Sequence, residues 1–170
     1  MKYENIIMKG DTNCVRYLLE KKGDKMLFFI GINPSTANEE NPDPTIKRVM
    51  GFAESNACDG FAMLNLYPQR STNPNSLHKE SCPELHSQNL TIYKELFVNT
   101  RNPIVVVAFG NNICIRKFLK DCLRDIAKVL SPYHPQWKRI GELTCKGNPR
   151  HPLYARYEPL QDFDIVSYLK

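Results

Sequence analysis

Short apolar runs alternate along the chain with segments whose apolar residues recur at helical spacing. Three runs, at 26–32, 61–66 and 104–109, are bounded by polar or turn residues and have the length of buried strands. The run at 104–109 is rich in β-branched residues, which favour a buried parallel strand. These runs therefore predict strands buried inside the protein.

Helices are predicted after each of these strands. Asp43 followed by Pro44 is typical of a helix start, and apolar residues recur at helical spacing beyond it, which predicts a helix over 44–56. Another helix is expected after Gly110. The remaining predicted elements are a helix over 83–100, a strand over 137–144 and a short helix over 163–169.

The alternation of strands and helices predicts an α/β protein, a three-layer α/β/α arrangement with a central, mostly parallel sheet. Residues 15–20 favour a further strand, and Gly23-Asp24 is typical of a hairpin turn, so an antiparallel edge pair is expected at the N-terminus. With 170 residues and 42% hydrophobic content, the chain is long enough for one core. We expect a single domain over residues 1–170.

Composition limits the function classes. The 23 Lys and Arg against 18 Asp and Glu give a net charge of +5, which suits an anionic partner such as nucleic acid. The six cysteines are scattered without the spacing of zinc or iron-sulfur ligands, so neither a metal nor another cofactor is predicted. We find no signal-peptide core and no apolar stretch long enough for a membrane span. We therefore expect a cytoplasmic protein, monomeric by default.

Polar residues follow three of the predicted strands. Asn33 comes directly after the first strand, Asn65 ends the second, and His151 follows the last. Because ligand sites of parallel sheets lie beyond the carboxyl ends of the strands, these three residues are expected to line one cleft. His134 is the rival for the histidine role, but it precedes the last strand.

The sequence around Asn33 restricts the backbone. Pro34 favours an extended conformation at Asn33, and Gly31 permits a close approach of the backbone to another group. Asp43 is predicted first of all to cap the helix that follows it, and it is a catalytic candidate only in second place.

These segments resemble known families. Gly31-Ile32-Asn33-Pro34 resembles the first motif of the uracil-DNA glycosylase superfamily, especially its mismatch- and thymine-specific branch, and His151-Pro152 resembles its second motif. Segments 65–70 and 105–112 resemble the base-recognition segment and the strand-glycine-helix unit. More closely, the stretch 33–37, with Asp43-Pro44-Thr45, Asn65-Leu66 and His151-Pro152, is similar to DUF1643, a bacterial and phage family known only as a domain of unknown function.

The glycosylase resemblance implies a fold like that of uracil-DNA glycosylase and roles for individual residues. Asn33 would position the water that attacks the sugar C1′, His151 would donate to the departing base, and Asn65 would read the base edge. The other predicted substrate-binding residues are Gly31, Ile32, Pro34 and Ser35 next to Asn33, Tyr67 for stacking because it adjoins Asn65, and Arg70 and Arg150 for phosphates.

Three functions remain open at this point. The leading hypothesis is hydrolysis of the N-glycosidic bond of a damaged or modified base in DNA. Because the fastest glycosylase branch has an aspartate where Asn33 stands, the alternative is a noncatalytic module that binds nucleobases or nucleic acid. The second alternative is a hydrolase or transferase that acts on small nucleotides or sugars through Asp43 and His151.

Overall fold

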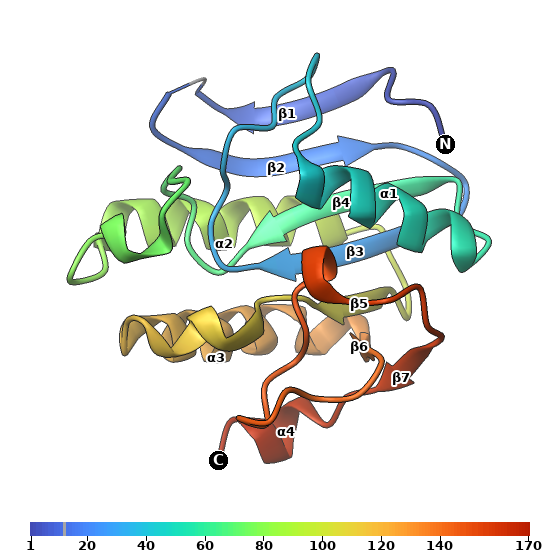
Figure 1. The fold of residues 1–170 in the computed structure, drawn as a ribbon. Helices are drawn as coiled ribbons and strands as arrows, with labels where there is room; N and C mark the ends of the chain where they lie inside the picture. Colours follow the sequence, from blue (N-terminus) through green and yellow to red (C-terminus); the bar gives the residue numbers. More distant parts are fainter. Residues whose placement is uncertain (12) are drawn as a thin grey trace.

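A mixed sheet of seven strands runs through the protein in the order β1-β2-β4-β3-β5-β6-β7 (Figure 1). The computed structural model describes residues 1–11 and 13–170. The four strands β4, β3, β5 and β6 are parallel, whereas β1, β2 and β7 run antiparallel to their neighbours. The strands are β1 (Ile6–Gly10), β2 (Arg16–Lys21), β3 (Met26–Gly31), β4 (Gly60–Asn65), β5 (Ile104–Val107), β6 (Gln136–Ile140) and β7 (Leu160–Asp162).

Helices cover both faces of the sheet. Helix α1 packs on one face, and α2 and α3 pack together on the other (Figure 1). Within the described residues, no helix is long and apolar enough to cross a bilayer. The α-helices are α1 (Pro44–Ser55), α2 (Pro83–Phe97), α3 (Phe118–Leu130) and α4 (Ile165–Tyr168), and short 3-10 turns are η1 (Pro74–Ser76), η2 (Gly110–Cys114), η3 (Ser131–Tyr133) and η4 (Pro152–Tyr154).

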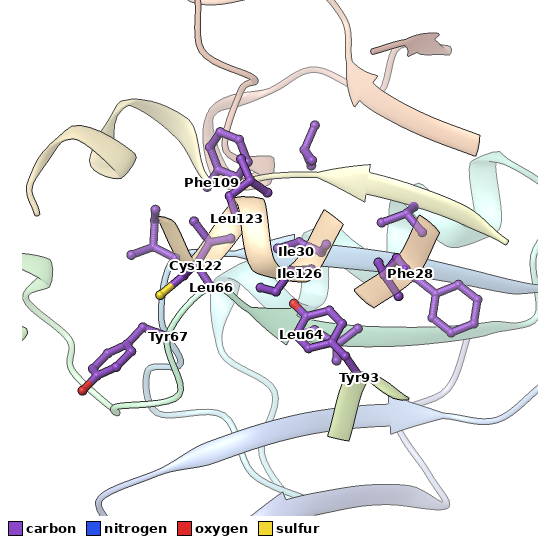
Figure 2. Close-up of a cluster of buried hydrophobic side chains, with 14 of the residues drawn as sticks. Phe28, Ile30, Leu64, Leu66, Tyr67, Tyr93, Phe109, Cys122, Leu123 and Ile126 are labelled. Carbon is purple, nitrogen blue, oxygen red and sulfur yellow. The ribbon is translucent and has the colours of Figure 1, made fainter. Parts of the chain in front are cut away.

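Strand β3 lies at the centre because its side chains are apolar on both faces. Phe28 and Ile30 point into the cluster under α2 and α3, which Figure 2 shows, whereas Leu27 and Phe29 belong to the cluster under α1. The neighbouring strands β4 and β5 pair with β3 through backbone hydrogen bonds along both of its edges. The core thus consists of two layers that share the sheet.

The start of α1 follows the predicted pattern. Asp43 Oδ1 accepts a hydrogen bond from the backbone N–H of Ile46 at 2.9 Å, and Pro44 occupies the first turn. The helix then buries Val49 and Phe52 against the sheet. The helix predicted over 44–56 is therefore confirmed to within one residue, as is the cap.

The predicted α/β class, the parallel central strands and the N-terminal antiparallel pair are confirmed, but the predicted turn of that pair is wrong. The pair consists of β1 and β2, and Gly23-Asp24 leads from β2 to β3, between which β4 is inserted. The all-apolar β3 requires a neighbour on each edge, so it cannot form half of an edge hairpin. The strand predicted over 137–144 ends at Ile140, because Gly141 adopts a φ of 50°.

The chain order creates a crevice at one end of the sheet. Strand β3 continues into α1 on one face, whereas its neighbour β5 continues through η2 into α3 on the other face. The two loops therefore diverge at the carboxyl ends of adjacent strands, the arrangement in which α/β proteins bind ligands.

Replacement of Phe29 by alanine tests the central position of β3. Phe29 is fully buried, so we expect Phe29→Ala to lower the free energy of unfolding by about 3–5 kcal/mol. Urea denaturation measures this loss. Val98→Ala, at an exposed position, serves as the control and should change stability by less than about 0.5 kcal/mol. Equal effects of the two substitutions would contradict this packing.

Candidate functional site

A cavity of about 640 Å³ opens at the carboxyl ends of β3 and β5. Its volume is in the range of small-molecule sites. The walls come from the loop after β3, the first turn of α1, residues 71–74 after β4, residues 109–112 after β5 and the segment 150–154. The crevice between the diverging loops is therefore a real cavity, built from segments far apart in the sequence.

Asn33 is held in place through its amide nitrogen. Its Nδ2 donates to the backbone carbonyls of Pro34 at 2.9 Å and Ser71 at 2.8 Å, which ties the loop after β3 to the loop after β4. An aspartate here would have no proton to offer either carbonyl. The amide oxygen accepts no hydrogen bond within the described residues, so Asn33 presents an acceptor at the cavity wall.

Asp43 serves the fold and the cavity at once. One carboxylate oxygen accepts the N–H of Ile46 and caps α1, whereas the other makes no hydrogen bond within the described residues. Because Asp43 also lines the cavity, it supplies a carboxylate at the wall opposite the loop after β5. Capping and contact with a ligand are therefore compatible here.

His151 enters the cavity wall at the start of η4. Its Nδ1 accepts the N–H of Leu153 at 3.3 Å, so the neutral ring carries its proton on Nε2 and presents a donor. Burial lowers the pKa of His151, and the charge of Asp43 partly opposes this shift. The ring is therefore neutral near pH 7.

The loop that carries His151 is fixed by a polar network. Asn148 Nδ2 donates to Asn111 Oδ1 at 3.0 Å, and the hydroxyl of Tyr168 donates to Asn148 Oδ1 at 2.6 Å. Gly110 has a φ of 62°, and a Cβ there would lie 3.2 Å from His151 Cβ. The glycine after β5 thus permits the close approach of the His151 loop.

Four predicted binding residues also line the cavity: Gly31, Ile32, Ser35 and Arg150. Arg150 is exposed at the rim, where its Nε donates to the carbonyl of Glu142 at 2.7 Å. Pro34 does not line the cavity, although its carbonyl helps to hold Asn33.

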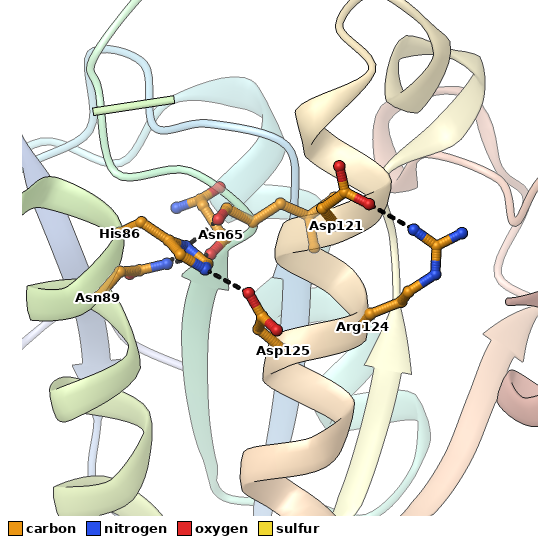
Figure 3. Close-up of polar contacts among 7 residues, drawn as sticks. Asn65, His86, Asn89, Asp121, Arg124 and Asp125 are labelled. Carbon is orange, nitrogen blue, oxygen red and sulfur yellow. Dashed lines mark hydrogen bonds and ion pairs between the residues drawn. The ribbon is translucent and has the colours of Figure 1, made fainter. Parts of the chain in front are cut away.

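Asn65 lies behind the cavity wall rather than in it. Its side chain is buried, and neither its amide oxygen nor its nitrogen has a hydrogen-bond partner among the described residues. A Cβ on Gly31 would come within 2.9 Å of Asn65 Oδ1, so the two residues are adjacent. Asn89 and Tyr93 donate to the backbone carbonyl of Asn65 and not to its side chain, and Figure 3 shows Asn89 approaching Asn65. In this arrangement Asn65 does not present its amide to a base in the cavity.

Tyr67 and Arg70 lie outside the cavity, in contrast to the prediction. Tyr67 is buried on the α2 and α3 side against Phe118, and its hydroxyl accepts the N–H of Cys82 at 3.0 Å. Arg70 donates to the carbonyls of Ser35 at 2.7 Å and Ala37 at 3.0 Å. Both side chains are thus engaged in the fold, and Arg70 braces the loop after β3.

Sequence reasoning missed Arg16, which lines the cavity although it is only 2% exposed. Its Nη1 donates to the carbonyl of Ala37 at 2.8 Å, whereas its Nε has no partner within the described residues. Burial, and then Arg70, lower the pKa of Arg16 to about 10, and Asp43 opposes the shift. In the sequence, the one sign of its role is that Arg16 is a charged residue directly before the apolar part of a predicted strand.

A second cavity, of about 690 Å³, lies at the other end of β5. Its lining comes from 98–102 and 132–134 and includes His134, the rival histidine, at an exposed position. Of the predicted site residues, none lines this cavity, and the amino ends of parallel strands are not where α/β proteins place ligands. Despite its larger volume, the chemistry favours the first cavity.

Fold and cavity together define an α/β protein with a cavity at the switch point of its sheet, and Asn33, Asp43, His151 and Arg16 line this cavity. In residues 1–11 and 13–170, no cluster of three or more histidine, cysteine or acidic side chains is arranged to hold a metal ion. The model of DUF1643, described as a protein of unknown function, matches residues 16–153, and the chain belongs to this family. Neither the curated proteins nor the solved structures contain a match to the chain.

Two substitutions separate the structural role of Asp43 from its charge. Asp43→Ala removes the cap and should lower the free energy of unfolding by about 1 kcal/mol. Asp43→Asn retains a capping oxygen and should cost only a few tenths of a kcal/mol. Thermal or chemical denaturation of both variants measures the difference; equal losses would contradict the capping role.

The partly buried His151 should make stability fall in mild acid. Its pKa is lowered from 6.5 in the folded protein, so above that pH both states are neutral and the histidine has no effect. As the pH falls from about 6.5 through the lowered pKa, the unfolded chain binds the proton more readily and the folded state loses stability. His151→Gln should reduce the fall in melting temperature between about pH 7.5 and pH 5. The control His134→Asn, at an exposed position, should leave this dependence unchanged.

Proposed function

We propose that the protein hydrolyses the N-glycosidic bond of a nucleobase-containing ligand held in the cavity at the switch point. The observation that carries this proposal is the meeting of three complementary groups around one cavity: the acceptor oxygen of Asn33 and the carboxylate of Asp43, both on the connection from β3 to α1, and the neutral imidazole of His151, on the connection after β6. The resemblance of the Asn33 and His151 segments to glycosylase motifs supports the same reaction.

The chemistry of the bond explains why these groups suit it. Cleavage passes through a sugar cation at C1′, while electrons of the breaking C1′–N bond move onto the base. The Asn33 oxygen accepts a hydrogen bond from the attacking water and orients it. The free oxygen of Asp43 stabilises the positive charge and takes the proton of that water as the new C1′–O bond forms.

His151 completes the reaction at the leaving group. Its Nε2–H donates a hydrogen bond to the departing base as negative charge develops there. A neutral imidazole is sufficient for this role, and the lowered pKa keeps it neutral. The two parts of the reaction are thus assigned to opposite sides of the ligand.

The rim of the cavity offers an aromatic surface. Tyr154 is 81% exposed, lines the cavity and lies with its ring centroid 5.8 Å from that of His151. Stacking of a base on an exposed aromatic ring contributes about 1–3 kcal/mol. This surface favours a planar ligand next to the proposed leaving-group donor, and Tyr154 takes the stacking role that was predicted for Tyr67.

Release of free base from a substrate panel tests the proposal. The panel contains nucleosides, nucleotides, and oligonucleotides with uracil, mismatched or modified bases, and chromatography detects the base. We expect Asn33→Ala and His151→Gln each to lower kcat by about 10²-fold or more, because each removes a group that acts in the transition state.

The matched control is His134→Asn, which alters a histidine of the other cavity and should retain full activity. Binding of bases or nucleotides without any base release would contradict hydrolysis and favour the noncatalytic module. Absence of both binding and release would contradict the nucleobase site itself.

A further inference from the structure

We propose that the inner end of the cavity is an anion site built on Arg16, and that the ligand is a small nucleotide whose phosphate pairs with this guanidinium. The anion site is inferred from the cavity alone. The identification of the anion as a nucleotide phosphate rests on the proposed function.

Arg16 is a buried charge without an ion-pair partner among the described residues. The side chain is 98% buried, and no ion pair joins it to a carboxylate in the part of the chain that the structure describes. Its one acceptor is the carbonyl of Ala37, and its Nε is unpartnered. A buried unpaired charge is costly, which the lowered pKa of Arg16 also reflects. An anionic ligand would remove this cost.

Three adjacent strands form the floor around Arg16. Arg16 on β2, Met63 on β4 and Gly31 on β3 all line the cavity. A Cβ on Gly31 would lie 2.6 Å from Met63 Cε, so the glycine leaves this floor uncrowded. Asn65 adds a second unpartnered and almost fully buried polar side chain next to Gly31. The unpartnered Nε of Arg16 is thus the unused donor of the floor itself, and Asn65 lies directly behind it.

The charge of the lining as a whole favours an anion in the cavity. The charged lining side chains are Arg16, Arg150 and Asp43, and the one carboxylate already caps α1. Arg16 and His151 line this same cavity of about 640 Å³. One small ligand can therefore contact both the anion site and the proposed leaving-group donor.

Depth distinguishes a nucleotide from a nucleic acid. Arg16 is only 2% exposed, so its guanidinium is out of reach for a phosphodiester in a duplex, whose neighbouring nucleotides would have to enter the cavity as well. A terminal phosphate on a single nucleotide can enter and accept two parallel N–H bonds from an arginine. The site therefore favours a small nucleotide as the substrate. This is the substrate class of the second alternative in the sequence analysis, an enzyme that acts on small nucleotides or sugars.

Calorimetric titration compares nucleosides with the 5′-monophosphates of the same bases, and inorganic phosphate alone. We expect the wild-type protein to bind at least one monophosphate about tenfold more tightly than its nucleoside, as one charge-assisted contact predicts. Arg16→Met should abolish this preference. Arg16→Lys keeps the charge but not the fork and should reduce it, which provides a second variant if Arg16→Met does not fold.

Arg70→Met is the matched control, because Arg70 donates to the same Ala37 carbonyl but does not line the cavity. If Arg16 had only a structural role, Arg16→Met would reduce the preference for monophosphates over nucleosides no more than Arg70→Met does. Equal affinity of the wild type for nucleosides and monophosphates would overturn the anion site, while base binding would preserve the proposed function. Arg16-dependent binding of phosphate without any binding of nucleosides or nucleotides would support the anion site and contradict the proposed function.

Discussion

The burial of β3 on both faces and along both edges is the constraint on which the rest of the structure depends. Because its residues are apolar throughout, β4 and β5 must flank it and helices must cover it above and below. The chain leaves β3 toward one face and leaves β5 toward the other. The cavity at their carboxyl ends follows from this geometry rather than from any single loop.

The loop after β3 is shaped by polar groups that bond its backbone. Asn33 reaches from this loop to the carbonyl of Ser71, and both Arg16 and Arg70 donate to the carbonyl of Ala37. The two arginines differ in their free hydrogen-bond donors. Arg70 donates to loop carbonyls, whereas Arg16 has an unpartnered Nε at the cavity floor. Two arginines thus hold the same loop carbonyl, and Arg16 is the one that also lines the cavity.

Local sequence patterns predicted the helices and strands, but they did not predict which strands pair when these are far apart in the sequence. The cap at Asp43 and the apolar run of β3 are encoded within a few residues, so both were read correctly. The insertion of β4 between β2 and β3 depends on pairing across the chain, which no short pattern specifies. For the same reason the hairpin expected at Gly23-Asp24 was wrong.

The candidate site shows the same division. Asn33, Asp43 and His151 follow strand ends or precede a helix, and the switch point brings them to one cavity. Asn65 and Tyr67 also follow a strand end, but their side chains are buried behind the wall and in the core. Arg16 carries no motif, and its position became visible only with the packing of β2 against β4.

The central claim, that the switch-point cavity is the ligand site, is tested most directly by NMR titration of ¹⁵N-labelled protein with nucleoside 5′-monophosphates. A ligand bound in this cavity should shift the amides of the loop after β3, the first turn of α1, the residues after β5 and the residues around His151. Shifts confined to residues 98–102 and 132–134, which line the other cavity, would contradict it.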